Sequence, residues 1–159
     1  MRIGILALQG AFAEHRDMLE SLGTDCTEIR QRKDFRENLD ALILPGGEST
    51  VMKKLLGELG LLNPIRKSIE DGMPVMGTCA GLILLAENVD GGEPCFGTMP
   101  VTVRRNAYGR QLGSFQTVEE VKGVGQFPMN FIRAPYIEKV REDVEILAVT
   151  EGNITAARY

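Results

Sequence analysis

The sequence predicts an α/β fold: an open, mainly parallel sheet with helices on both faces, and added antiparallel strands in the C-terminal half. Three observations support this prediction. Continuous apolar runs at residues 2–8 and 39–44 are typical of strands covered on both faces of a parallel sheet. Helical patterns separate such runs in the first half of the chain. Beyond residue 88, alternation of apolar and polar residues indicates strands with one exposed face.

The chain begins with a strand and a helix. Residues 2–8 form the predicted first strand. A helix is expected over residues 11–22, ending at Gly23, and its apolar face comprises Ala11, His15, Met18, Leu19 and Leu22. We interpret His15, the only histidine, as a hydrogen-bonded packing residue rather than a base, because it lies on this apolar stripe.

The next segments continue the alternation of strands and helices. A second strand is expected at residues 25–29, followed by a charged, solvated connector at 30–38. A helix further along begins with Asn63 as N-cap and Pro64 at its first position, and it extends through residue 70.

Between these segments, a strand at residues 39–44 runs into the turn 45–49, Pro-Gly-Gly-Glu-Ser. Ser49 is the expected N-cap of a helix over about residues 50–61. Adjacent glycines allow backbone N–H groups to turn toward a ligand. A loop and cap with no ligand explain this segment equally well.

Cys79 lies at a predicted corner between a strand and a helix. A brief buried strand is expected at residues 74–76 and an apolar helix at 82–86. Gly77 and Gly81 are residues that allow a strand and a helix to approach closely around a strained turn. The pattern is that of a nucleophile elbow.

The position of Cys79 suggests chemistry. A helix N-terminus favours the thiolate, which is the nucleophilic form of cysteine. The N–H of Ala80, immediately after the cysteine, is the first candidate donor to an oxyanion. The alternative is that Cys79 is a small buried core residue, as free cysteines often are.

The second half is expected to add mixed or antiparallel strands, at residues 98–104, 114–118, 129–133, 144–149 and 154–159. The last two strands form a hairpin through residues 151–153. Arg105 and Arg133 lie beside glycine- and proline-containing loops, and a planar guanidinium suits carboxylate recognition. Most surface arginines are simply solvated.

Composition restricts the class of protein. A chain of 159 residues predicts one domain, and the net charge of −4 gives no reason to expect nucleic acid or a membrane as partner. The first strand starts directly after Met1, so we expect a cytoplasmic protein. Cys26, Cys79 and Cys95 are odd in number and widely spaced, which indicates neither disulfides nor zinc, and we interpret Cys26 and Cys95 as structural.

Five motifs follow one another from the first strand toward Tyr159. They are Leu8-Gln9-Gly10-Ala11, Leu44-Pro45-Gly46-Gly47-Glu48-Ser49-Thr50, Gly77-Thr78-Cys79-Ala80-Gly81, Arg105-Asn106 with Gly109-Arg110-Gln111, and Phe131-Ile132-Arg133-Ala134-Pro135. On these motifs the chain resembles the glutaminase subunit of the pyridoxal 5′-phosphate synthase complex, a class I (triad) glutamine amidotransferase. The Gly-x-Cys-x-Gly motif alone indicates only the wider superfamily.

The resemblance implies a flavodoxin-like fold that hydrolyses L-glutamine to L-glutamate and ammonia without cofactor or metal. The ammonia would pass to a separate, barrel-shaped synthase subunit in a hetero-oligomeric complex. Cys79 is the implied nucleophile, and the N–H groups of Gly47 and Ala80 are the oxyanion hole. The residues implied to bind L-glutamine are Gly47, Glu48, Ser49, Arg105, Ile132 and Arg133. We hypothesise that the two arginines hold the α-carboxylate, with Glu48 near the α-ammonium group.

One departure from the family pattern concerns the base. The triad of the family needs a histidine and a glutamate in a His-Pro-Glu segment downstream of the last hairpin, and residues 1–159 contain no such segment. We expect both residues in a C-terminal strand and helix segment beyond Tyr159. Two other functions stay open: a catalytically impaired binding or regulatory partner of the synthase subunit, and a non-glutaminase cysteine hydrolase of the same broad fold.

Overall fold

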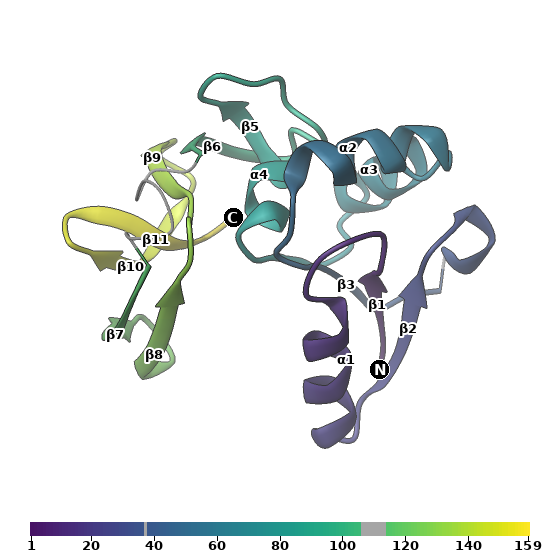
Figure 1. Ribbon diagram of the computed structural model, residues 1–159, viewed down its shortest axis with the longest axis horizontal. Coiled ribbons are helices and arrows are strands. Elements are labelled where there is room, and N and C mark those ends of the chain that lie inside the picture. The colour runs from purple at the N-terminus through teal and green to yellow at the C-terminus, as the bar shows by residue number, and fades with distance from the viewer. Residues whose placement is uncertain (37, 106–113) are drawn as a thin grey trace. The chain divides into compact units, whose positions relative to one another are not determined.

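The computed structural model describes residues 1–36, 38–105 and 114–159. The chain divides into two compact units, Met1–Leu85 and Ala86–Tyr159 (Figure 1). The organisation as one domain stays a prediction. No helix within the described residues is long and apolar enough to span a bilayer.

The first unit is a parallel sheet with helical connections (Figure 1). The sheet order is β2-β1-β3-β4, so both later strands lie on the same side of β1. The elements in chain order are β1 (Arg2–Leu6), α1 (Phe12–Ser21), β2 (Asp25–Ile29), the 3₁₀ helix η1 (Arg32–Asp34), β3 (Ala41–Leu44), α2 (Ser49–Glu58), α3 (Leu62–Glu70), β4 (Val75–Gly77) and α4 (Ala80–Leu85).

Helices cover both faces of this sheet, as predicted. Successive strand residues point to opposite faces. On one face, Ile3, Ile5 and Ile43 form a buried cluster with Leu19 of α1. On the other face, Leu44 lies against Gly81 of α4, where an added Cβ would be 2.8 Å from the Leu44 Cβ.

Two helix starts differ from the prediction. The predicted N-cap Ser49 is wrong, because Glu48 caps α2 with its carboxylate, and Ser49 is the first helical residue and is buried. The predicted N-cap Asn63 is also wrong, because α3 begins at Leu62 after a Leu61 cap that makes no side-chain bond. Leu61 is fully buried, so packing of an apolar side chain fixes this helix start.

Two predicted apolar surfaces also differ. Leu19 is the buried residue of α1, whereas Met18 is 60% exposed and Leu22, the C-cap residue that follows the helix, is 70% exposed. The strand predicted as buried at residues 74–76 is β4, which pairs only with β3 among the described strands. Its Met76 is 54% exposed because β4 lies at the edge of this sheet.

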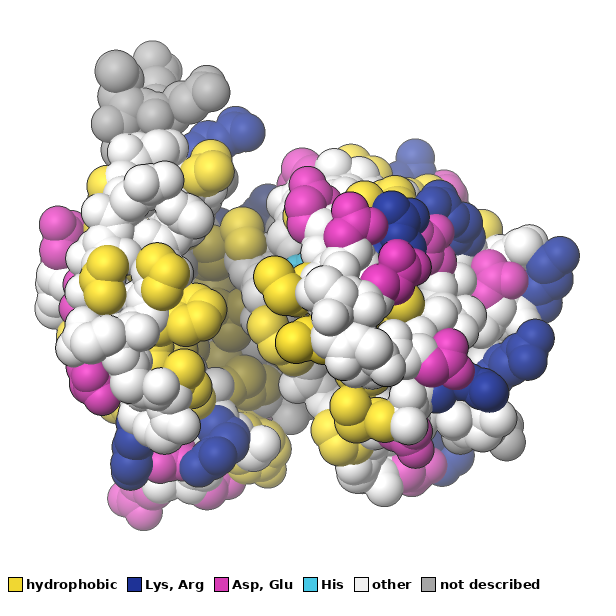
Figure 2. Space-filling view, turned by 90° about the horizontal axis from the view of Figure 1, so that it is seen from below, with side chains coloured by type: hydrophobic (Ala, Val, Ile, Leu, Met, Phe, Trp, Pro, Cys, Tyr) yellow, Lys and Arg dark blue, Asp and Glu magenta, His cyan; other side chains and the backbone are white. Residues whose placement is uncertain are grey.

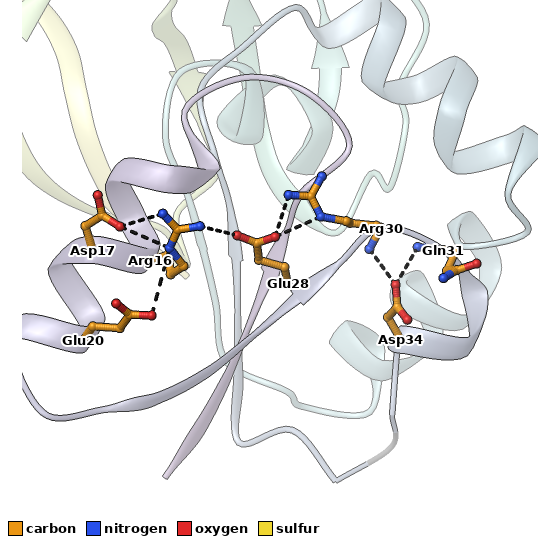
Figure 3. A network of polar contacts seen from close by, with 7 residues as sticks. All are labelled: Arg16, Asp17, Glu20, Glu28, Arg30, Gln31 and Asp34. Carbon is orange, nitrogen blue, oxygen red and sulfur yellow. Dashed lines mark hydrogen bonds and ion pairs between the residues drawn. The ribbon is translucent and has the colours of Figure 1, made fainter.

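A network of charged side chains joins α1 to β2 and η1 (Figure 3). Glu28 of β2 accepts from Arg16 of α1 at 2.9 Å and from Arg30 at 2.6 and 2.9 Å. The Arg30 guanidinium also lies over the Phe12 ring, 4.8 Å from its centroid. Asp34 accepts the backbone N–H groups of residues 30 and 31. The predicted connector therefore includes ordered ion pairs in addition to solvated charges, and residue 37 lies outside the described residues.

The second unit is built of strands (Figure 1). Its larger sheet has the order β10-β11-β9-β6-β5, with only β5 and β6 parallel among the pairs described, and β7 and β8 form a separate hairpin. The strands are β5 (Ala86–Val89), β6 (Met99–Arg104), β7 (Phe115–Val121), β8 (Gly125–Phe131), β9 (Tyr136–Val140), β10 (Glu145–Thr150) and β11 (Asn153–Arg158).

The added antiparallel strands are confirmed, with some differences. The predicted hairpin through residues 151–153 joins β10 to β11, and Glu151 and Gly152 both have positive φ. The sequence did not predict β5 or β9. The expected alternation in residues 98–104 is confirmed apart from Pro100: Met99, Val101 and Val103 are buried, Thr102 is half-buried and Arg104 is exposed, whereas Pro100 is buried as well.

Lys122, at the turn of the β7–β8 hairpin, bonds to strand β10 of the larger sheet. Lys122 donates its backbone N–H to the Leu147 carbonyl at 2.8 Å, and its ammonium lies 2.7 Å from Glu145. The Phe115 and Phe131 rings stack at the other end of the hairpin, 4.7 Å apart. Apolar side chains are exposed along the hairpin, including Val118, Val124 and Phe127. Figure 2 shows hydrophobic side chains together with charges of both signs on this unit.

Candidate active site

Cys79 lies in the turn between β4 and α4, as predicted. The strand ends at Gly77 and the helix begins at Ala80. Cys79 has a φ of 50°, in the left-handed region that residues with a Cβ rarely adopt. The residue is exposed, which excludes the alternative of a buried core cysteine. A strained and exposed nucleophilic side chain is the arrangement expected of an elbow.

The corner depends on two glycines. A Cβ added to Gly77 would lie 2.7 Å from the Gly81 carbonyl carbon. A Cβ added to Gly81 would lie 2.0 Å from the Leu44 carbonyl oxygen. Neither backbone has room for a side chain, so the predicted close approach of strand and helix is confirmed. The same close packing brings Cys79 to the carboxyl end of the parallel strands.

The glycine turn after β3 lies beside Cys79. A Cβ added to Gly46 would be 3.4 Å from the Cys79 Cβ and 3.7 Å from the Thr78 carbonyl oxygen. The turn that contains Gly47 and the cysteine turn therefore form one site in the first unit. This proximity is what the ends of neighbouring parallel strands, β3 and β4, produce.

The loop after β1 fixes the conformation of the glycine turn. Ala11 donates its N–H to the Gly46 carbonyl at 2.9 Å, which sets the orientation of the peptide that carries the Gly47 N–H. The Gln9 side chain accepts the Glu48 N–H at 2.7 Å. A Cβ added to Gly47 would be 2.5 Å from the Gln9 Oε1, so a side chain there would displace the Gln9 amide from the Glu48 N–H. This role of Gln9 and Ala11 was not predicted from the sequence.

Glu48 and Ala80 supply the polar groups around the turn. Glu48 is exposed, and its two carboxylate oxygens accept the N–H groups of Thr50 and Val51 at 3.1 and 2.9 Å. These bonds hold an anionic group at the rim of the site. Ala80 is the first residue of α4, where backbone N–H groups have no partner within the helix.

His15 lies next to the cysteine turn. Its Nε2 is 3.3 Å from the Thr78 Oγ1, and Thr78 is the residue before Cys79. Burial lowers the pKa of His15, while the charge of Glu14 acts in the opposite direction. The prediction of a hydrogen-bonded histidine is confirmed. Its partner could not be predicted from the sequence, because the two residues are 63 positions apart.

The other predicted site residues belong to the second unit. Arg105 follows β6, while Ile132 and Arg133 precede β9. Because Arg104 pairs with Tyr136, these residues lie at the same end of the β6–β9 strand pair. Ile132 is 64% exposed, and Arg133 is exposed with a φ of 46°. The remainder of the arginine motif, Asn106 with Gly109-Arg110-Gln111, lies outside the described residues.

An exposed cysteine in a strained corner beside a glycine turn is suited to acyl transfer through a thioester. Similarity to known proteins identifies the family of this chain. The profile of the SNO glutamine amidotransferase family matches residues 5–159, and the chain belongs to this family.

Several curated relatives are closely similar over nearly the whole chain. A pyridoxal 5′-phosphate synthase subunit PdxT from Desulfitobacterium hafniense is 57% identical over 160 residues, covering 100% of this chain and 80% of the relative. A protein of the same name from Methanocorpusculum labreanum is 59% identical over 158 residues, covering 99% of this chain and 84% of the relative.

Solved structures agree with the fold. A crystal structure of a glutamine amidotransferase is 43% identical with a TM-score of 0.91, and the match covers 98% of this chain and 84% of that one. Another glutamine amidotransferase, from Thermotoga maritima, matches with a TM-score of 0.64 at 14% identity, covering 98% of this chain and 69% of that one. The second similarity shows the fold alone.

Proposed function

We propose that this chain hydrolyses L-glutamine to L-glutamate and ammonia, and that it supplies the ammonia to a synthase subunit that makes pyridoxal 5′-phosphate. Family membership and relatives named as subunits of that synthase support the proposal. The observation that carries the chemistry is the exposed Cys79 at a φ of 50° beside the Gly46–Gly47 turn. We place the reaction in the cytoplasm.

The reaction proceeds in two steps at Cys79. The Sγ thiolate forms a bond to the side-chain carbonyl carbon of glutamine, and negative charge develops on the amide oxygen. The N–H groups of Gly47 and Ala80 are our candidates to stabilise this charge. The carbon–nitrogen bond then breaks, the nitrogen takes up the proton that the Cys79 thiol released and leaves as ammonia, and a thioester remains. Water hydrolyses the thioester, which releases glutamate and restores the thiol.

Charged groups select the substrate in this proposal. Arg105 and Arg133 bind the α-carboxylate, because a planar guanidinium bonds both carboxylate oxygens. Glu48 lies near the α-ammonium group, and Ser49 and Ile132 complete the glutamine site. The carboxylate of Glu48 is already oriented by the first turn of α2, so it needs no reordering to attract a cation.

Covalent labelling tests the nucleophile directly. The protein is treated with 6-diazo-5-oxo-L-norleucine, a glutamine analogue that alkylates a thiolate with loss of nitrogen gas, and the modified peptide is identified by mass spectrometry. We expect modification at Cys79 and protection by L-glutamine. Cys26 and Cys95 are internal controls, and their modification in preference to Cys79 would overturn the proposal. Modification of Cys79 without protection by glutamine would instead favour another cysteine hydrolase.

A further inference from the structure

The helix α1 contacts both halves of the candidate site. Ala11, at its N-terminal cap, donates to the Gly46 carbonyl of the glycine turn. His15, four residues later, is hydrogen-bonded to Thr78 in the cysteine turn. Residues four apart lie on the same face of a helix. One rigid element therefore holds the glycine turn and the cysteine turn at the same time.

Thr78 is held by three separate hydrogen bonds. Its backbone N–H donates to the Leu44 carbonyl at 3.1 Å, and its carbonyl accepts the Gly81 N–H at 2.9 Å. Its hydroxyl is the group that bonds to His15 at 3.3 Å. The two backbone bonds join Thr78 to the neighbouring strand β3 and to the first turn of α4, whereas the hydroxyl bond links the corner to α1.

The next residue needs such support. Cys79 has a φ of 50°, and a non-glycine residue retains that conformation only when its surroundings fix it. The Thr78 carbonyl oxygen is also 3.7 Å from the position of a Cβ on Gly46, so a shift of Thr78 would change the spacing of the two turns.

We propose that His15 is a positioning residue: through the Thr78 hydroxyl it holds the Cys79 turn in register with the Gly46–Gly47 turn. This inference rests on the proposed function, in which those two turns supply the nucleophile and an oxyanion donor. Burial lowers the pKa of the imidazole and so favours its neutral form, in which one ring nitrogen can still bond to the Thr78 hydroxyl. It does not take a proton from the thiol in this proposal.

The test measures the rate constant for alkylation of Cys79 by 6-diazo-5-oxo-L-norleucine in the whole protein. His15→Ala and Thr78→Val each remove one partner of the bond. We expect each variant to react about three- to tenfold more slowly, the factor that a neutral hydrogen bond typically carries. The double variant should be no slower than the slower single variant, because both changes remove the same interaction.

Conservative variants separate positioning from loss of structure. His15→Gln keeps a polar nitrogen near the Nε2 position, and Thr78→Ser keeps the hydroxyl, so both should react within about twofold of the wild type. Met18→Ala, at an exposed position on the same helix, is the matched control. The glutamine concentration that gives half-protection should stay unchanged in His15→Gln and Thr78→Ser, and the alkylation rate of Cys26 should not change in any variant.

The outcomes distinguish this inference from the function on which it rests. If the wild type is not labelled at Cys79, the proposed function fails. If the wild type is labelled but His15→Ala reacts at the same rate, only the positioning role fails. The positioning role would also be overturned if the fold-reductions in alkylation rate of the two single variants multiplied in the double variant, because the two residues would then act independently. If His15→Ala does not fold, the alkylation rates of Thr78→Val and Thr78→Ser are compared instead, and equal rates in these two variants would overturn the positioning role.

Discussion

The two units hold their candidate functional residues in different ways. In the first unit, the turns around Cys79 and Gly47 are fixed by backbone contacts so close that a Cβ on Gly10, Gly77 or Gly81 would overlap a backbone carbonyl group. In the second unit, Ile132 and Arg133 are exposed side chains on a connection between strands. The nucleophile therefore depends on steric constraint, and the proposed specificity depends on charge.

This difference separates two kinds of mutational effect. A substitution at the glycines of the first unit should reduce the stability of the fold and the reactivity of the cysteine together. A substitution at the arginines of the second unit should weaken glutamine binding and leave stability nearly unchanged. Measurements of stability and of glutamine binding on the same variants distinguish the two effects.

The largest effect is expected from Gly81→Ala. The new Cβ would lie 2.0 Å from the Leu44 carbonyl oxygen, which cannot move without distorting β3. We expect the free energy of unfolding to fall by about 3 kcal/mol, the upper range for overpacking. Urea unfolding followed by circular dichroism measures this change.

Gly57→Ala is the matched control for this substitution. Gly57 lies in α2 and an added Cβ there meets nothing within 4 Å. Alanine should therefore stabilise the protein by about 0.5–1 kcal/mol through its helix propensity. If Gly81→Ala were as stable as Gly57→Ala, steric constraint would not be what fixes the cysteine corner.

The second prediction concerns Arg133→Ala. Loss of a charge-assisted bond to the α-carboxylate should raise the KM for glutamine about 10- to 100-fold, with a smaller change in kcat. Ammonia release by the full chain together with the synthase subunit provides the measurement.

Arg141→Ala serves as the control for charge alone. Arg141 follows the far end of β9 and pairs with Glu87 and Asp143, so its loss should leave KM unchanged. Unchanged glutamine saturation in Arg133→Ala would remove the assignment of this arginine to the carboxylate.

The first unit was more predictable from sequence than the second, for physical reasons. The corner at Cys79 depends on neighbouring residues, since Gly77 and Gly81 flank the cysteine and short apolar segments lie on both sides. A pattern of this kind is local and can be read along the chain. In contrast, the strand at residues 136–140 has no clear alternation and forms because β6 and β11 lie on either side of it.

Features that depend on distant partners were not predictable. The exposure of Met76 follows from the position of β4 at the edge of its sheet, which no local pattern determines. The cap of α2 shifted from Ser49 to Glu48 because the Gln9 side chain accepts the Glu48 N–H and fixes that residue before the helix. The bond between His15 and Thr78 likewise joins two segments that lie far apart in the chain.

The smallest expected effect is the response of the two units to acid. Burial lowers the pKa of His15, so the unfolded chain binds a proton more readily than the folded one. The contribution of His15 to the free energy of unfolding should therefore decrease as the pH falls below about 6.5, the pKa of an unperturbed histidine.

In the second unit, Lys122 and then Arg158 lower the pKa of Glu145. The contribution of ionised Glu145 to the free energy of unfolding is fully present above about pH 4.3, and it is lost only as the pH falls through the lowered pKa.

Urea midpoints measured between about pH 8 and pH 3 distinguish these two groups, because the range spans the unperturbed pKa values of both. His15→Gln should remove part of the decline just below about pH 6.5, and Glu145→Gln should remove part of the decline at lower pH. Each variant should leave the other range unchanged, because the two groups belong to different compact units. If His15→Gln altered only the range below about pH 4, the imidazole would not be the group that makes the first unit sensitive to mild acid.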